Sequence, residues 1–235
     1  MKKFQDMRTP LVEGVYDKNI FKAIFLAGGP GSGKSYVAKA STGGMGLKMV
    51  NSDDQFEFML DKEGLTKKMN TPRGERETEK RDAVRDYAKG LTAKKRGDLG
   101  TGKGGFVEGR LGMIIDGTGH DFDKIARQSS KLRMLGYETY MVFVNTSLDV
   151  ALQANAKRDR VVPTSVVTKS HRAVQSNLGK FSGHFRGNLV IVDNNDREEE
   201  PLKIAFKQVG RLLRKPVNNQ IAKNWIAMEL EKKRR

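Results

Sequence analysis

Short apolar runs alternate with longer amphipathic segments along most of the chain. The first run, FKAIFLA at residues 21–27, is almost continuously apolar and is followed by glycine, which is typical of a strand buried in a parallel sheet. The alternation of such runs with helical patterns indicates βαβ units. We therefore predict an α/β fold of three layers, in which a parallel sheet of about five strands lies between helices. The other four strands are expected at 47–50, 112–116, 139–144 and 188–193, with helices from about residue 53, over 121–135 and over 147–157.

Both ends of the chain fall outside this pattern. A polar leader covers residues 1–20, and residues 21–195 are expected to form one domain, because a chain of 235 residues suits a single core. The segment 200–235 predicts two basic helices separated by Pro216. We expect the second of these helices to bury Ile221, Trp225 and Met228.

An insertion of alternating charge occupies residues 62–110 and ends in the glycine-rich stretch GDLGTGKGG at 97–105. This composition predicts a helical excursion followed by a mobile loop. Its position suits either a substrate gate or a surface for a partner.

The composition adds a strong positive charge to this picture. The formal net charge is +16 and the pI is about 10.0, and ten basic residues but only two acidic ones follow residue 202. Such a balance favours polyanionic partners. The chain has no cysteine and three scattered histidines, which argues against thiolate chemistry and a histidine metal cluster. Neither a membrane span nor a secretory signal is visible, so we expect a cytoplasmic protein without membrane association.

The strongest motif is the sequence GGPGSGKS, which satisfies the P-loop pattern G-x-x-x-x-G-K-[ST] between an apolar strand and a helix start. Its glycines let successive N–H groups point at phosphates, its lysine bridges the outer phosphates, and its last serine binds Mg²⁺. The alternative, a ligand-free glycine turn, leaves Lys34 unexplained. The predicted ligands are ATP and Mg²⁺, with nucleotide contacts from Gly28, Gly29, Pro30, Gly31, Ser32, Gly33, Lys34, Ser35 and Tyr36.

Carboxylates follow the second predicted strand in the sequence VNSDDQF. They are expected at the carboxyl edge of the sheet, on the same rim as the P-loop, where ligands bind in open α/β folds. There Asp53 would bind the acceptor hydroxyl and accept its proton during phosphoryl transfer. The simpler interpretation is a helix N-cap by Asp53 or Ser52. Because the same chain contains a P-loop, we favour catalysis for Asp53 over the capping role.

The third strand ends in IIDGTGHDFD, which places Asp116 on the same rim. A carboxylate there would hold Mg²⁺ directly or through water, together with Ser35. Alternatively, Asp116 caps the turn. His120 is expected to be exposed or to cap a helix.

A basic segment, AKRDRVVP at 156–163, follows the fourth predicted helix, and Pro163 suits the start of the next one. Arginines on such a hinged loop would act as a lid. Arg158 and Arg160 would then neutralise charge on the transferred phosphoryl group, beside Lys34 as a further catalytic residue. Without a ligand, the same residues would form a solvated basic helix end.

Taken together, these motifs resemble the branch of P-loop kinases that contains polynucleotide 5′-kinases and zeta toxins. The similarity to polynucleotide 5′-kinases lies in GGPGSGKS, in NSDD at 51–54 and in the basic segment ending in Val162 and Pro163. This resemblance implies a P-loop kinase fold, Asp53 as the general base and Arg158 as the lid arginine.

The middle of the chain is more similar to zeta toxins, which are kinases acting on UDP-linked amino sugars. The similar sequences are DGTG at 116–119 and GYET at 136–139. That resemblance implies that Asp116 and Thr118 contact the substrate, so the role of Asp116 between substrate and metal stays open.

One position departs from the polynucleotide kinases, which carry an arginine three residues after the base where this chain has Phe56. This difference leaves specificity for a polynucleotide open. Phage-encoded kinase-like proteins also look similar, in VNSD at 50–53 and in the R-x-R-x-V-P lid, which implies a phage origin and a host-cytoplasm location.

Three functions are consistent with the sequence. The first is an ATP-dependent kinase whose acceptor is a hydroxyl of a nucleic acid or nucleotide. The second is a zeta-toxin-like kinase of UDP-sugars, whose basic surface would bind an acidic inhibitor protein. The third is an ATP-binding nucleic-acid or assembly module without kinase activity. We favour phosphotransfer because the phosphate cradle, the base, the metal acid and the lid arginines occur in the expected order.

Overall fold

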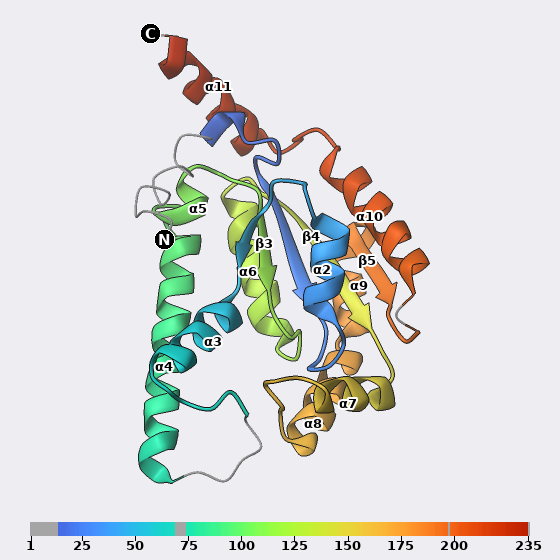
Figure 1. Cartoon of the computed structure of the whole chain (residues 1–235). Coiled ribbons are helices and arrows are strands. Elements are labelled where there is room, and N and C mark those ends of the chain that lie inside the picture. Colours follow the sequence, from blue (N-terminus) through green and yellow to red (C-terminus); the bar gives the residue numbers. More distant parts are fainter. Residues whose placement is uncertain (1–13, 69–73, 197, 235) are drawn as a thin grey trace.

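The computed structural model describes residues 14–68, 74–196 and 198–234 (Figure 1). Residues 1–13 of the predicted leader lie outside these ranges. Five strands form one parallel sheet in the order β2-β3-β1-β4-β5, which confirms the predicted fold class. The strands are β1 (Lys22–Ala27), β2 (Lys48–Val50), β3 (Met113–Asp116), β4 (Glu138–Asn145) and β5 (Leu189–Asp193).

The central strand, β1, is buried along its whole length because helices cover both faces of the sheet. Its side chains alternate between two apolar layers. Ile24 and Leu26 belong to the layer under α2 (Lys34–Thr42) and α10 (Glu199–Leu213), whereas Phe25 belongs to the layer under α6 (Phe122–Met134) and α9 (Leu178–Phe185) (Figure 1). The result is the predicted arrangement of three layers.

Two further pairs of helices lie around the sheet. At the β2 edge, α3 (Ser52–Lys62) packs against the long helix α4 (Glu75–Arg96), and Phe56 lies between them with only 2% of its surface exposed. Beyond the carboxyl ends of the strands lie α7 (Leu148–Ala156) and α8 (Thr164–Ser176) (Figure 1). Both pairs therefore flank the edge where ligands bind in open α/β folds.

Within the predicted insertion at 62–110, the expected helix is α4, residues 69–73 lie outside the described ranges, and the second half belongs to the main core. Leu99 and the short helix α5 (Gly105–Glu108), through Phe106 and Val107, pack into the same apolar layer as Phe25. The glycine-rich stretch is a closed turn, because the Asp98 carboxylate accepts hydrogen bonds from the N–H groups of Gly100 and Thr101. The insertion is therefore an integral part of the domain.

The C-terminal helices also differ from the expected basic tail. Helix α10 buries Leu202, Ala205, Val209, Leu212 and Leu213 against the sheet, so it is a core element. In α11 (Gln220–Arg234) the expected burial is confirmed for Trp225, which packs against the core, and is wrong for Ile221 and Met228. Ile221 and Met228 are 53% and 52% exposed, and Ala222 and Ile226 pack with Trp225 instead.

A buried lysine of β1, Lys22, contacts both β4 and the segment between α10 and α11. Lys22 Nζ forms an ion pair with Glu138 at 2.6 Å and donates a hydrogen bond to the carbonyl of Lys215 at 2.8 Å. Part of the predicted leader packs here as well, since Asp17 and Asn19 are buried. Among the described residues, no helix is long and apolar enough to cross a membrane.

Candidate functional site

The P-loop connects β1 to α2 and needs glycine for steric reasons. Gly31 and Gly33 adopt left-handed conformations with φ of 81° and 79°. A side chain at Gly31 would collide with the carbonyl of Ala151, and one at Gly33 would collide with the amide of Asn194. Gly33 caps α2 without a side-chain hydrogen bond, so the first N–H groups of the helix face the ligand side.

Two contacts hold this loop in place. The Asn194 side chain, which follows β5, donates a hydrogen bond of 2.8 Å to the carbonyl of Ser32. On the other side, the N–H of Gly28 donates to the carbonyl of Thr118 at 2.9 Å. The loops after β1, β3 and β5 are thereby joined into one rigid rim.

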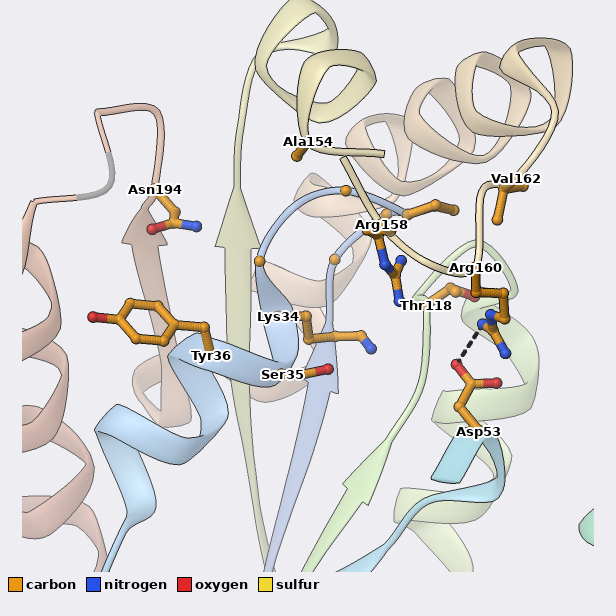
Figure 2. A pocket seen from close by; sticks show the side chains of 15 residues that line it. Lys34, Ser35, Tyr36, Asp53, Thr118, Ala154, Arg158, Arg160, Val162 and Asn194 are labelled. Atoms are coloured by element: carbon orange, nitrogen blue, oxygen red, sulfur yellow. Dashed lines mark hydrogen bonds and ion pairs between the residues drawn. The ribbon is translucent and has the colours of Figure 1, made fainter. Parts of the chain in front are cut away.

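A cavity of about 560 Å³, hereafter the donor cavity, lies above this rim (Figure 2). Its walls come from the P-loop, from α3 and from the segment between α7 and α8. In Figure 2, Lys34 and Arg158 point into the same space, and Asp53 faces Arg160. The lining residues include Gly28, Gly29, Pro30, Gly31, Gly33, Lys34, Ser35, Tyr36, Asp53, Thr118, Arg158, Arg160 and Asn194.

Lys34 forms an ion pair with Asp116, with 2.6 Å between Nζ and Oδ1. The Asp116 side chain is only 7% exposed, and this oxygen accepts no hydrogen bond of ordinary geometry. A buried carboxylate oxygen with spare acceptor capacity suits Mg²⁺, a hard cation that prefers oxygen ligands. Ser35, at the start of α2, offers a second oxygen in the donor cavity. The residues present therefore fit a magnesium ion held jointly with phosphate oxygens.

The Asp53 carboxylate is not used as a helix cap, because Asn51 caps α3. The side chain of Asn51 accepts the hydrogen bond from the N–H of Asp53 at 2.8 Å, so the predicted alternative of a cap by Asp53 or Ser52 is wrong. The Asp53 carboxylate instead accepts a hydrogen bond of 3.1 Å from Arg160. The neighbouring Asp54 is exposed and accepts from the Asn51 amide at 3.1 Å.

The surroundings of these two aspartates move their pKa values in opposite directions. Burial alone would raise the pKa of Asp53, but the charge and hydrogen bond of Arg160, with smaller effects of Lys34 and Arg85, hold it below its ordinary value. Burial and the nearby charges of Asp116 and Asp53 raise the pKa of Asp54. Asp53 is therefore the carboxylate that is ionised over the wider range of pH.

The predicted lid is the segment between α7 and α8, and the Asn155 side chain holds it through hydrogen bonds to its backbone. The Asn155 side chain, which is buried, donates to the carbonyl of Val162 at 2.7 Å and accepts from its N–H at 3.1 Å. Arg160 reaches from this segment to Asp53 and to Glu57, and its Nη1 is buried without a hydrogen-bond partner. An anion in the donor cavity would supply the missing acceptor.

The DGTG loop after β3 forms the remaining wall. The buried side chain of Asn177 fixes this loop by donating to the carbonyls of Gly119 and His120 at 3.1 and 3.0 Å. The hydroxyl of Thr118 hydrogen-bonds the ring of His120, while the cap of α6 is Asp121. His120 is thus an exposed residue, as expected, and does not cap the helix.

A second cavity of about 290 Å³ lies beside the first, and Thr118 lines both. Asp116 lines this second cavity, whereas its ion-pair partner Lys34 lines the donor cavity. The wall between the cavities therefore consists of the Lys34–Asp116 pair and Thr118. Among the described residues, no group of three or more His, Asp or Glu side chains could by itself hold a metal ion.

Most of the residues expected at the site meet here. Lys34, Ser35, Asp53, Arg158 and Arg160 line the donor cavity together. Ser32 does not belong to this group, because its side chain is buried and lies outside the cavity lining. The structure therefore does not place the Ser32 side chain where a nucleotide contact was expected.

Sequence reasoning missed the asparagines that hold the site together: Asn155, Asn177 and Asn194. Asn194 could have been found, because it follows the fifth strand and so obeys the same edge rule that singled out Asp53 and Asp116. Asn155 and Asn177 lie in and after helices, and nothing in the local pattern marks them as supports.

No protein-family model matches the chain, and no curated protein is recognisably similar to it in sequence. Solved structures do match. One from the PezAT chromosomal toxin–antitoxin system of Streptococcus pneumoniae has a TM-score of 0.53 at 14% identity, covering 92% of this chain and 98% of that one. A proposed kinase from Chloroflexus aurantiacus has a TM-score of 0.52 at 16% identity, covering 81% and 97%.

The AvrRxo1-ORF1:-ORF2 structure with ATP matches with a TM-score of 0.51 at 16% identity, covering 80% of this chain and 59% of that chain. The chain shares its α/β fold, with a parallel five-stranded sheet between helices, with these structures. At these low identities the likeness establishes the fold, and the chemistry rests on the residues of the site.

Proposed function

We propose that the protein is an ATP-dependent kinase that transfers the γ-phosphate to a hydroxyl group. The observation that carries this proposal is the donor cavity, which gathers the P-loop, one ionised carboxylate and two lid arginines from three separate parts of the chain. A protein that only binds ATP needs the P-loop but has no use for Asp53 beside it.

The P-loop and α2 would bind the triphosphate. Backbone N–H groups at the helix start face the phosphates, and Lys34 exchanges Asp116 for a phosphate oxygen. Ser35 and Asp116 would hold Mg²⁺, which neutralises charge on the β- and γ-phosphates when it is bound. Binding of the nucleotide would thereby free a carboxylate at the wall between the cavities.

Asp53 would orient the acceptor hydroxyl and take its proton as the new oxygen–phosphorus bond forms and the bond to the leaving ADP breaks. The lowered pKa of Asp53 keeps it ready to accept a proton at neutral pH. Arg160 positions this carboxylate, and Arg158 points into the cavity, where it would stabilise the transferred phosphoryl group (Figure 2).

For the acceptor, we favour a hydroxyl of a nucleic acid or a nucleotide. The net charge of +16 favours such polyanions. Phe56, the residue that departs from polynucleotide kinases, is buried between α3 and α4 and therefore contacts no substrate. A UDP-linked amino sugar is the competing acceptor, which the DGTG loop and the likeness to a toxin–antitoxin structure favour.

The experiment is a transfer assay with γ-labelled ATP and Mg²⁺ against oligonucleotides, mononucleotides, nucleosides and UDP-sugars. Label on an oligonucleotide or nucleotide is expected, and apparent affinity for an oligonucleotide should fall steeply with salt because counterions are released on binding. Label on a UDP-sugar alone would replace this acceptor with the competing one. Binding of ATP without transfer to any acceptor would reject the kinase and leave an ATP-binding module.

A protein partner is a further part of the proposal. One matching structure comes from a toxin–antitoxin system. Another, AvrRxo1-ORF1:-ORF2, contains two different protein chains. We propose an acidic inhibitor protein, which the basic surface would attract. Inhibition of transfer by a candidate acidic protein, relieved by salt, is the test, and unchanged transfer at saturating inhibitor would reject that candidate.

A further inference from the structure

The second cavity has walls from four segments that are far apart in the sequence. Ser52 comes from the start of α3, Thr92 and Arg96 come from α4, and Lys124 and Gln128 come from α6, while the DGTG loop closes the side toward the donor cavity. The insertion thus contributes a whole wall, through α4. No part of the function proposed above explains why this wall is basic.

Three of the basic residues of α4 lie in a row on one face of the helix. Arg85, Lys89 and Arg96 are spaced by four and seven residues, which places them on one side of a helix with 3.6 residues per turn. Lys89 and Arg96 line the second cavity. Arg85 lies over the ring of Phe56, with its Cζ 5.1 Å from the ring centroid, and its charge also lowers the pKa of Asp53.

The acidic side chains of this cavity have hydrogen-bond or ion-pair partners, whereas, among the described residues, two of its basic side chains form no ion pair. Asp116 is paired with Lys34, and the Asp121 carboxylate accepts the hydrogen bond from the N–H of Lys124 that caps α6. Within the described ranges, neither Arg96 nor the ammonium of Lys124 forms an ion pair. The guanidinium of Arg96 donates a hydrogen bond from its Nε to the carbonyl of Gly97 at 3.2 Å. In the nucleotide-free protein the acids of this cavity are therefore engaged, whereas Arg96 and Lys124 are available to an anion. The third cation, Lys89, is already paired with Asp86 at 2.9 Å.

We propose that the second cavity binds a phosphate group of the acceptor, with Arg96 and Lys124 gripping it from opposite walls and Lys89 at its rim. The proposal rests on the kinase function argued above and narrows its acceptor to a phosphate ester or diphosphate that also carries the reacting hydroxyl. Thr118, which lines both cavities, lies between the bound phosphate and the site of transfer. A strand of nucleic acid and a nucleotide sugar share this chemistry.

The test compares acceptors that differ only in a phosphate: a nucleoside 3′-monophosphate against the nucleoside, and an amino-sugar 1-phosphate against the free amino sugar. In each pair that reacts, the phosphate-bearing acceptor should have the lower KM. Arg96→Gln and Lys124→Gln should each raise that KM by about 10- to 100-fold, the value of one hydrogen bond to a charged group. The KM of the neutral acceptor and the KM of ATP should not change.

Matched controls come from the same helices. Lys94→Gln in α4 and Arg127→Gln in α6 remove the same charge at exposed positions that do not line the cavity. These two variants should leave every KM unchanged. Equal use of the neutral and phosphate-bearing acceptors by the wild type, or equal effects of control and cavity variants, would overturn the proposal.

A binding measurement separates this proposal from the kinase function. With the donor cavity filled by a non-hydrolysable ATP analogue, calorimetry should still detect binding of inorganic pyrophosphate, and Arg96→Gln or Lys124→Gln should abolish it. Pyrophosphate binding without transfer to any acceptor would reject the kinase function and keep the anion site. Transfer without pyrophosphate binding would keep the kinase function and reject the site.

Discussion

Lys34 and Asp116 form an ion pair of 2.6 Å across the wall that separates the donor cavity from the second cavity. Because both side chains are largely buried, each satisfies the charge of the other as long as no nucleotide is bound. The same lysine belongs to the P-loop that would bind ATP. We therefore expect nucleotide binding to exchange one partner of Lys34 for another, and to leave Asp116 available to a metal ion or to the acceptor.

Replacing Lys34 with alanine should have two separable effects. Calorimetry should show the dissociation constant of ATP rising by about 10- to 100-fold, because a charged hydrogen bond to the phosphates is lost. The nucleotide-free protein should lose about 3 kcal/mol of unfolding free energy, because the Asp116 carboxylate stays buried without its partner.

Two comparisons control this prediction. Lys39→Ala, at an exposed position of α2, should change neither quantity. Adding Asp116→Asn to Lys34→Ala should restore most of the lost stability but none of the ATP affinity. Additive destabilisation by the two changes would contradict the pairing of these side chains.

The contact between Arg160 and Asp53 predicts a shift in pH dependence. Transfer requires ionised Asp53, so the rate falls as the pH drops through the pKa of that group, which Arg160 holds below its ordinary value. In Arg160→Gln the raising effect of burial is opposed less, so the acid limb of kcat/KM should move to higher pH. Arg158→Gln should lower the rate without moving the limb, since the pKa of Asp53 is lowered mainly by Arg160. An unmoved limb in Arg160→Gln would reject Asp53 as the titrating group.

The buried position of Phe56 predicts that its packing between α3 and α4 contributes strongly to stability. Phe56→Ala should cost about 3 to 5 kcal/mol of unfolding free energy, because a buried aromatic side chain is lost between α3 and α4. Phe58→Ala, in the same helix but 65% exposed, should cost less than about 0.5 kcal/mol. Thermal and denaturant unfolding measure both values. Equal losses for the two variants would contradict the packing of α4 through Phe56.

The two hydrogen bonds of Asn155 predict that this buried amide fixes the position of the segment between α7 and α8. Asn155→Ala removes both hydrogen bonds to Val162 and should lower kcat by about tenfold, because Arg158 and Arg160 lose their fixed positions. Gln153→Ala removes an exposed amide from the same helix and should leave kcat unchanged. Limited proteolysis between residues 157 and 163 should accelerate only in Asn155→Ala, and an unaltered cleavage rate would argue against this role.

The strands were predictable to within about one residue, because each apolar run ends in polar or turn residues at the sheet edge, as at Asp116 and Asn194. The edge rule then brought Lys34, Asp53 and Asp116 together correctly, since the carboxyl ends of parallel strands must meet. Local capping was less predictable. Asn51, Ser52 and Asp53 are all good caps, and only the backbone geometry shows that Asn51 takes the role.

Features that depend on packing between distant elements could not be predicted. The apolar residues of α11 fit several rotations of the helix. The contact with Phe21 selects Trp225, rather than Ile221 or Met228, as the partly buried side chain that packs on the core. Likewise, the charge of residues 62–110 indicates a surface but not that α4 would line a cavity beside Asp116. Such placements come from tertiary contacts, which the local pattern does not contain.

The central claim is that Asp53 takes part in phosphoryl transfer and not merely in the structure of the site. The most direct measurement compares wild type, Asp53→Asn and Asp54→Asn for transfer from γ-labelled ATP to the best acceptor, with ATP affinity measured in parallel. We predict that Asp53→Asn lowers kcat by about 10²- to 10⁴-fold with ATP affinity retained, and that Asp54→Asn changes kcat less than tenfold. Equal transfer rates in wild type and Asp53→Asn would contradict the account.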